Sequence, residues 1–407
     1  MEFTKYKLGD LMEVTRGMSL CGKHYATEGN LMRLTLGNFD YHNNCFKDDK
    51  SKDNLYFTGS VKKDFILNKD DIITPLTEQA IGLLGSTAKI PFSGKYIQSQ
   101  DVALIKCNEK LYPDFAFYLI SSKMVRFQLS AAAQQTKIRH TSPDKIKDCT
   151  VWVPEYSVQK KIGDLLTTID KKISINREIN RNLEELAKQI YDYWFVQFDF
   201  PNEDGKPYKS SGGKMVWNEL LKREIPSGWE AGILNEIIEI KRGKTITEKQ
   251  TTSGTIKVVA AGLTYSYFHG ESNRTANCIT VSGSGENAGF VNFWREPIFA
   301  SDCSTIQFES EIDTIFCYYT LKKHEKRFYQ ISHKSGQPHI LPSDIGEIPM
   351  VFPSKSIKDK TASFFINANK QIAENTRELE LLFVLRNSLL PLLMNGQVTL
   401  NSCLSHD

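Results

Sequence analysis

The sequence lacks the features that mark several large classes of protein. It contains no run of about 18 uncharged apolar residues, so a membrane-spanning helix is excluded. The eight cysteines are far apart, and the closest pair, Cys303 and Cys317, does not have the two-to-four-residue spacing of a zinc site. The first residues do not form the basic and then apolar segment of a signal peptide. We therefore expect reduced cysteines, no bound metal and a cytoplasmic location.

Motifs of catalysis are missing as well. The chain has no phosphate-binding GxxxxGK[ST] loop, no Gly-x-Ser-x-Gly elbow, no HExxH motif and no Asn/Asp-Pro-Pro-aromatic motif of amino-methylating enzymes. Residues 283–289 are rich in glycine but lack the required lysine, so they predict a turn between strands or, alternatively, a close approach to a ligand backbone. The eight histidines have no neighbour that suggests a nucleophile and its base. We expect a chain that is not an enzyme and binds no cofactor itself.

Size and composition indicate a globular protein with more than one domain. The chain has 407 residues and a mass of 46.3 kDa, which corresponds to two or three folding units at about 150 residues each. Hydrophobic residues make up 40% and charged residues 24%, as in proteins with a proper core. The net charge of +3 permits nucleic-acid binding without requiring it, because phosphates are recognised by a local basic surface.

The informative feature is an internal repeat. An aromatic residue, a short apolar stretch and an Arg-Gly pair follow one another at 6–17 and again at 229–243. Asp101 is echoed by Asp302, and three further positions recur 199 residues later, namely Pro143, Ile146 and Pro154 as Pro342, Ile345 and Pro353. The two copies agree at their edges and differ in their centres. This pattern favours a common scaffold with two different recognition surfaces, although old duplicates that drift everywhere would also leave matches of this kind.

A long helical pattern follows each copy. Apolar positions recur at steps of three and four residues, which predicts the seam of a coiled coil. Asparagines stand in both seams, where they fix the register by requiring a polar partner. The seam residues on which we rely most are Ile169, Ile173, Asn176, Leu183, Ile372, Asn375, Leu379 and Leu382.

These helices are predicted to pair with each other. A helix over residues 158–193 would be about 54 Å long at 1.5 Å per residue, more than a small domain needs. The alternative is two ordinary amphipathic helices inside compact domains, but the heptads run too long for it. We therefore expect an antiparallel coiled coil between the two copies.

The chain is accordingly divided into six parts with an α+β fold. Short β-rich runs are separated by turns, and each copy has one amphipathic helix, near 114–129 and near 313–331. A polar segment rich in glycine and proline joins the halves. The predicted parts are the first copy (1–155), a central long helix (156–197), a linker (198–227), the second copy (228–352), a C-terminal long helix (353–396) and a tail (397–407).

Two surfaces in each copy are suited to nucleic acid. One is a basic, polar loop behind the amphipathic helix, and the other follows each Arg-Gly pair. Glutamine and arginine are suited to base edges, and lysine to phosphates. The same residues suit a solvated face, a sugar or a peptide almost as well, so base contacts cannot be separated from phosphate contacts here. The candidates are Lys23, Arg33, Gln135, Lys137, Arg139, Lys244, Tyr265, Arg274, Lys334, Gln337 and His339.

With these parts in place, the chain resembles the DNA specificity (S) subunit of type I restriction–modification systems over essentially its whole length. The most specific elements are the helix end Gln189–Phe195, the segment 198–207, the Ile225-Pro-Ser-Gly-Trp229 stretch and the proline before the second helix. The usual glutamine of the family appears as Gln159, whereas the second copy has Lys358 at the matching place.

The resemblance implies a targeting subunit whose two copies are target-recognition domains. Such a subunit reads a bipartite, asymmetric target in double-stranded DNA and docks methyltransferase and restriction subunits. S-adenosylmethionine and ATP with Mg would be bound by those partners. Two alternatives are a stand-alone two-headed DNA-binding regulator, which would bind its site without partners, and a coiled-coil protein scaffold, which would show no salt-dependent DNA affinity.

Overall fold

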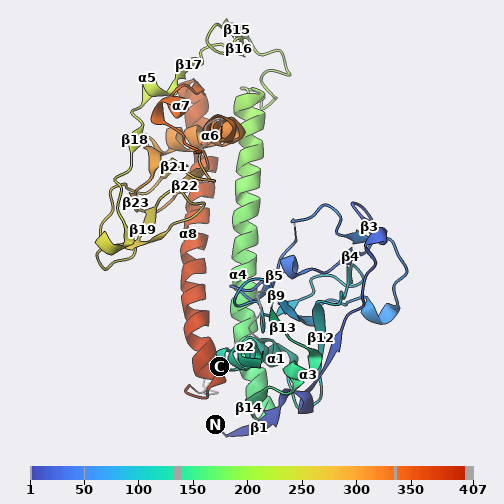
Figure 1. The fold of residues 1–407 in the computed structure, drawn as a ribbon. Helices are drawn as coiled ribbons and strands as arrows, with labels where there is room; N and C mark the ends of the chain where they lie inside the picture. The colour runs from blue at the N-terminus through green and yellow to red at the C-terminus, as the bar shows by residue number, and fades with distance from the viewer. Residues whose placement is uncertain (1, 50, 133–138, 334–336, 399–407) are drawn as a thin grey trace, which may run out of the picture. The chain divides into compact units, whose positions relative to one another are not determined.

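A computed structural model describes residues 2–49, 51–132, 139–333 and 337–398. The chain divides into two compact units (Figure 1). The first unit comprises Met1–Ser174 and Glu380–Asp407, and the second comprises Ile175–Leu379. Each unit thus contains one copy of the repeat together with part of both long helices, and each is described by itself below.

The first unit is built around a four-stranded antiparallel sheet in the order β10-β8-β12-β2. A mixed sheet in the order β11-β4-β7-β3 and three two-stranded pairs, β1-β14, β9-β13 and β5-β6, complete its β structure. β8 is buried throughout, as expected of an apolar run inside a sheet. The strands are β1 (Phe3–Lys7), β2 (Met12–Arg16), β3 (Tyr25–Ala26), β4 (Met32–Arg33), β5 (Phe39–Asp40), β6 (Cys45–Phe46), β7 (Tyr56–Phe57), β8 (Ile72–Pro75), β9 (Thr77–Glu78), β10 (Ala88–Lys89), β11 (Tyr96–Ile97), β12 (Val102–Cys107), β13 (Arg139–His140) and β14 (Thr150–Pro154).

Three short helices cover this unit: α1 (Pro113–Ile120), α2 (Lys123–Ala132) and α3 (Pro143–Lys147). The single helix expected near 114–129 is therefore wrong for the first copy, because the chain breaks at two serines. The Ser121 hydroxyl donates to the carbonyl of Tyr118, and the Ser122 hydroxyl accepts from the amide of Val125, so the side chains replace backbone bonds at the junction. Near the other end of the chain, Gly396 lies so close to the ring of Phe3 that a Cβ would come within 2.5 Å of it.

The second unit repeats this plan with a different centre. Its sheets have the orders β18-β24-β21-β22 and β20-β19-β23, and β15-β16 and β17-β25 form pairs. Here the amphipathic helix is continuous. The strands are β15 (Met215–Asn218), β16 (Arg223–Pro226), β17 (Glu230–Ile233), β18 (Lys241–Arg242), β19 (Ile256–Val259), β20 (Tyr267–His269), β21 (Cys278–Ser282), β22 (Val291–Trp294), β23 (Ile298–Ala300), β24 (Cys303–Ile306) and β25 (Pro349–Phe352), and the helices are α5 (Leu234–Ile237), α6 (Glu311–Ser332) and α7 (Pro342–Gly346).

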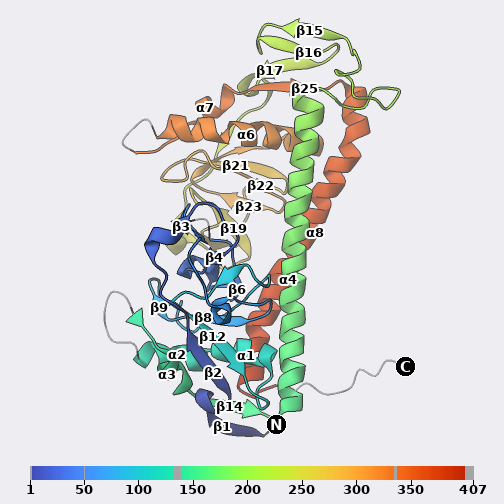
Figure 2. The ribbon, with the colours of Figure 1, turned by 90° about the vertical axis from the view of Figure 1, so that its right-hand side faces the viewer.

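The repeat is visible in strand pairing as well as in sequence. β1 pairs with β14 and β17 pairs with β25, both antiparallel, and Figure 2 shows each pair side by side. The two Arg-Gly pairs also occupy equivalent places. A Cβ on Gly17 would overlap the carbonyl oxygen of Ser99, and a Cβ on Gly243 would overlap that of Ser301. Glycine is required at both positions because only a residue without a side chain permits so close an approach.

The two long helices, α4 (Tyr156–Tyr191) and α8 (Lys355–Met394), pair in an antiparallel coiled coil, as predicted. A π-helical segment (192–196) continues α4. In the second unit, Asn375 Nδ2 donates to Asn180 Oδ1 at 2.9 Å and Asn176 Nδ2 donates to Glu378 Oε2 at 2.7 Å. Residue numbers therefore increase along α4 in the direction in which they decrease along α8, so the two helices run antiparallel.

The first unit shows the same arrangement. Arg386 Nη1 donates to Asp170 Oδ1 at 2.9 Å, and the Tyr118 hydroxyl donates to the other carboxylate oxygen at 2.6 Å. Burial, followed by the nearby carboxylate of Asp170, strongly raises the pKa of Tyr118. Of the predicted seam residues, Leu183, Leu379 and Leu382 are partly buried, whereas the following are buried: Ile169, Ile173, Asn176, Ile372 and Asn375.

The segment expected to be a polar linker (198–227) is structured. It contains the hairpin β15-β16, and its two phenylalanines, Phe198 and Phe200, are buried. The Phe200 ring stacks on Tyr208 and on Trp229, with centroids 4.6 and 5.1 Å away. The Arg223 guanidinium lies over the Phe198 ring. The polar average composition of this segment did not reveal its folded structure, because a few aromatic residues determine how the segment packs.

A substitution in the seam tests the helix pair. Ile372 is 3% exposed in the second unit, so Ile372→Asp would bury a carboxylate in an apolar seam and should lower the free energy of unfolding by about 3–5 kcal/mol. Urea denaturation of the whole chain would measure this. Leu381→Asp places the same charge on α8 where the side chain is 64% exposed, and it should change stability by less than about 0.5 kcal/mol. Equal stability of both variants would contradict the pairing.

Candidate nucleic-acid interface

In the first copy, four segments that are distant in sequence meet at one junction. The amide of Leu76 donates to the carbonyl of Asp101 at 2.8 Å, and the amide of Thr141 donates to the carbonyl of Leu76 at 2.9 Å. Gly17, in the Arg-Gly pair, donates to the carbonyl of Val102 at 3.3 Å. Next to these bonds, Thr77 on β9 stands opposite His140 on β13. The Thr77 hydroxyl donates to Asp101 Oδ1 at 3.2 Å.

The second copy reproduces the junction bond by bond. The amide of Gly283 donates to the carbonyl of Asp302 at 3.3 Å, and the amide of Ile340 donates to the carbonyl of Gly283 at 3.0 Å. Gly243 donates to the carbonyl of Cys303 at 2.8 Å.

Beside this second junction, Ser284 forms an isolated bridge with His339, and its hydroxyl donates to Asp302 Oδ2. An aspartate, a hydroxyl and a histidine therefore come together at the same place in both copies. The sheet junction fixes this cluster, because every segment that carries one of the three side chains is held there by backbone bonds.

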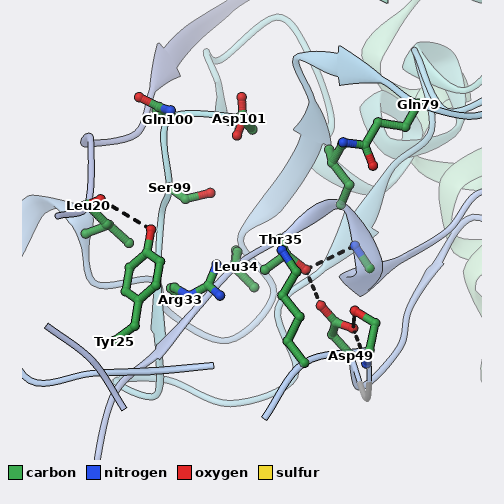
Figure 3. A pocket seen from close by; sticks show the side chains of 14 residues that line it. Leu20, Tyr25, Arg33, Leu34, Thr35, Asp49, Gln79, Ser99, Gln100 and Asp101 are labelled. Atoms are coloured by element: carbon green, nitrogen blue, oxygen red, sulfur yellow. Dashed lines mark hydrogen bonds between the residues drawn. The ribbon is translucent and has the colours of Figure 1, made fainter. Parts of the chain in front are cut away.

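A polar cavity of about 210 Å³ opens beside the junction of the first copy. Figure 3 shows Asp101 and Gln79 across this cavity from Arg33 and Thr35. On its far side, the Thr35 hydroxyl donates to Asp49. Burial favours a higher pKa for Asp49, but hydrogen bonds from Ser51 and Thr35 outweigh it and lower the pKa. This carboxylate is therefore occupied within the protein.

The second copy has a smaller cavity, of about 100 Å³, at the matching place. Asp302, Arg242 and Thr245 line it together with His339 and Cys303. Burial raises the pKa of the Cys303 thiol to about 12, so this sulfur is not a thiolate nucleophile at neutral pH. Both cavities thus offer hydrogen-bonding groups.

The predicted loop residues meet this interface only in part. Gln135, Lys137 and Lys334 lie outside the described residues. Arg139 Nη1 donates to the Ser130 hydroxyl at 3.0 Å and lies 3.5 Å from Glu78 Oε2. Gln337 is exposed, and His339 is exposed at the mouth of the second cavity. Among the loop candidates that the structure describes, His339 lines the second cavity, and Arg139 lies on β13 beside the first junction.

The second set of candidates divides into exposed side chains and arginines that are bonded within the protein. Lys23, Lys244 and Tyr265 are exposed. Arg33 is buried, lies 4.0 Å over the Tyr25 ring, and donates from Nε and Nη2 to Asn54.

Arg274 is committed more strongly. Its three nitrogens donate to Thr305 Oγ1 at 2.8 Å and to the carbonyls of Asn273 and Arg242 at 2.7 and 3.1 Å. The guanidinium therefore holds three segments of the second unit together.

Sequence reasoning overlooked Asp101 and Thr77, and their counterparts Asp302 and Ser284, as site residues. It placed His140 in the first basic loop but not among the candidates. A signal was available for the aspartates, because they recur in the repeat. The hydroxyl residues were harder to match, because they lie in the centres of the copies, where the lengths differ. Only the strand pairing aligns Thr77 with Ser284.

Metal and membrane sites can be assessed for the part of the chain that the structure describes. There, no group of three or more His, Cys, Asp or Glu side chains could hold a metal ion. Within the same ranges, no helix is long and apolar enough to cross a lipid bilayer. Cys21 is an exposed thiol, and Cys149, Cys278, Cys303 and Cys317 are buried thiols.

The double arrangement of sheets, junctions and long helices is that of a DNA specificity subunit. A family model described as "Type I restriction modification DNA specificity domain" matches residues 1–185 and 226–382, and the chain belongs to this family. The two matched ranges each contain one copy of the repeat, which confirms the family assigned from sequence.

Individual relatives agree. The chain is 22% identical to the specificity subunit of type I restriction enzyme HindI from Haemophilus influenzae over 74% of this chain and 81% of the relative. It is 21% identical to the MjaIX specificity subunit of Methanocaldococcus jannaschii over 70% and 69%. A crystal structure of a type I restriction–modification S subunit from M. genitalium matches 97% of this chain and 96% of that one, with a TM-score of 0.66 and 18% identity. The fold predicted from the sequence, two α+β copies with a helix pair, is confirmed.

The role of Arg274 can be tested directly. Arg274→Ala removes three hydrogen bonds of a charged group and leaves two carbonyls without this donor, so the free energy of unfolding should fall by about 2 kcal/mol or more. Lys244→Ala removes an exposed lysine of the same unit and should change stability by less than about 0.5 kcal/mol. Urea denaturation compares the two. A stability loss in the lysine variant and none in the arginine variant would reverse these assignments.

Proposed function

We propose that this chain is the specificity subunit of a type I restriction–modification complex and reads a bipartite, asymmetric target in double-stranded DNA. The observation that carries the proposal is the pair of junctions: one scaffold, present twice, surrounds its cavity with different side chains in each copy. Two different surfaces on one chain fit two different half-sites. In this assignment the target-recognition domains are residues 1–155 and 228–352. The long helices are residues 156–197 and 353–396, and the linker 198–227 joins the first of them to the second domain.

The long helices are proposed to dock methyltransferase subunits. In the second unit, α4 exposes apolar side chains at heptad-related spacing, namely Ile175, Ile179 and Leu186. In the first unit, α8 exposes a cluster of Leu381, Val384 and Leu385. Large apolar side chains in such rows are costly in water and are typical of a helix that packs against a partner.

The partners are proposed to supply all catalysis. Burial raises the pKa of the Cys303 thiol to about 12, so the second cavity holds no thiolate. The hydroxyls of Thr77 and Ser284 each donate a hydrogen bond to a carboxylate of their own junction. Methyltransferase subunits would hold S-adenosylmethionine, and restriction subunits would hold ATP and Mg. We place the complex in the cytoplasm, where its DNA is found and where cysteines stay reduced.

Co-expression with a methyltransferase subunit of the same restriction–modification system tests the proposal. The purified complex should methylate DNA at one sequence, read by sequencing the modified bases, and that sequence should consist of two unlike parts around an unread gap. Two outcomes favour the alternatives. Tight sequence-specific binding by the chain alone indicates a stand-alone regulator, and absence of salt-dependent DNA binding indicates a protein scaffold.

The basic loops behind the two amphipathic helices should each affect recognition of a different half of the target. Changing Gln135, Lys137 and Arg139 together to alanine should relax recognition of one half of the target, because each base contact contributes on the order of 1–3 kcal/mol of discrimination. Changing Lys334, Gln337 and His339 should relax only the other half. Methylation of a panel of singly mutated targets measures both effects. Uniform weakening over all targets by either triple variant would show that the loops contact phosphates.

The docking surface gives an independent prediction. Leu381→Asp combined with Leu385→Asp places two charges in the exposed apolar cluster, so co-purification with the methyltransferase subunit should fall at least about tenfold while urea stability stays unchanged. Asn387→Asp adds a charge on the same helix at an exposed polar position and should leave assembly intact. Undiminished assembly of the double variant would remove this cluster from the interface.

A further inference from the structure

The duplicated aspartates have hydrogen-bonding capacity that the fold does not use. Asp101 and Asp302 are half-buried, and each accepts a hydroxyl bond on one carboxylate oxygen only. Both line the polar cavity of their own copy. Among the residues that the structure describes, no cationic group forms an ion pair with either carboxylate. In both copies, a carboxylate therefore lines the cavity, and one of its oxygens accepts no hydrogen bond from the residues that the structure describes.

A DNA-binding surface is an unusual place for such a group. A carboxylate repels phosphates, so these two side chains do not serve the backbone contacts on which nucleic-acid affinity depends. An ionised carboxylate only accepts hydrogen bonds. Its partner must be a donor, and the donors that DNA offers in the major groove are the amino groups of cytosine and adenine.

We propose that Asp101 and Asp302 each accept a hydrogen bond from the exocyclic amino group of one base, a cytosine or an adenine, in their own half-site. This assignment rests on the proposed function. It specifies that the base beside the aspartate of each domain is a cytosine or an adenine. Guanine and thymine present carbonyl oxygens at the same place in the groove. An oxygen against a carboxylate is repulsive, so the aspartates select by rejection as well as by attraction.

The junction holds each carboxylate ready for this contact. Thr77 is 5% exposed, and its hydroxyl binds Asp101 from a strand that the backbone bonds of the junction already fix. Ser284 does the same for Asp302. A side chain held before binding loses little conformational freedom on binding, so the contact discriminates more sharply.

The neighbours of the aspartates explain why the half-sites still differ. The first cavity presents Gln79 and Gln100 in addition to its own cations, Arg33 and Lys52, whereas the second presents Arg242 and His339. Glutamine suits adenine, and arginine suits guanine. The two domains therefore share an aspartate that contacts a base, and they surround this aspartate with different side chains.

The experiment uses the complex of this chain with its methyltransferase subunit. Its wild-type target is first identified by sequencing modified DNA, and Asp101→Asn and Asp302→Asn are then assayed on targets that carry each base at every specified position. Asparagine keeps the acceptor for the hydroxyl and adds a donor, so it tolerates guanine and thymine. Each variant should lose about tenfold or more discrimination at one position, occupied by cytosine or adenine, in one half-site.

Each variant contains its own control, because the other half-site must still be read normally if the protein is folded. Asp144→Asn, at a side chain 86% exposed on α3, removes the same charge away from the cavity and should change no position. Unchanged discrimination at all positions in both variants overturns the proposal, and so does equal relaxation across a whole half-site, which would make the aspartates positioning residues. If the wild-type complex reads no sequence at all, the proposed function itself fails.

Discussion

Both long helices belong to the cores of the units through which they pass, and the rest of the structure depends on this shared burial. Ile162 and Leu166 of α4 pack in the first core together with Leu393 of α8. Ala187 and Tyr191 of α4 pack in the second core with Phe365 of α8. Because each core needs turns of both helices, neither helix can shift along the other without opening apolar surface to water, at about 25 cal/mol per Å².

Polar residues reinforce the register that this burial fixes. Asp170 and Asn369 stand 199 positions apart, at equivalent points of the two helices. Asp170 accepts from Tyr118 of its own copy, and Asn369 accepts from Arg295 of its own copy at 2.7 Å. One position in each helix thus ties that helix to the copy that precedes it, with a different partner in each case.

The sequence indicated the parts of the molecule that follow from a period, and it missed those that follow from single contacts. The heptads of Ile173 and Ile372 and the recurrence of Asp101 as Asp302 were readable because a repeat leaves a regular trace. The helix break at Ser121 and the packing of Phe200 on Trp229 were not, because one hydroxyl or one ring decides them. Arg274 looked like a ligand for DNA, yet its charge holds three chain segments together.

The approach of Gly396 to the ring of Phe3 has a consequence for how such a chain can be encoded. Residues close to the two ends of the described chain meet in the first unit, so a short bridge there would join them without disturbing the β1-β14 pair. A circularly permuted chain, with these two ends joined and new ends at another exposed turn, would then form the same set of contacts. The order in which the two copies are translated is consequently a property of the gene and is not imposed by the fold.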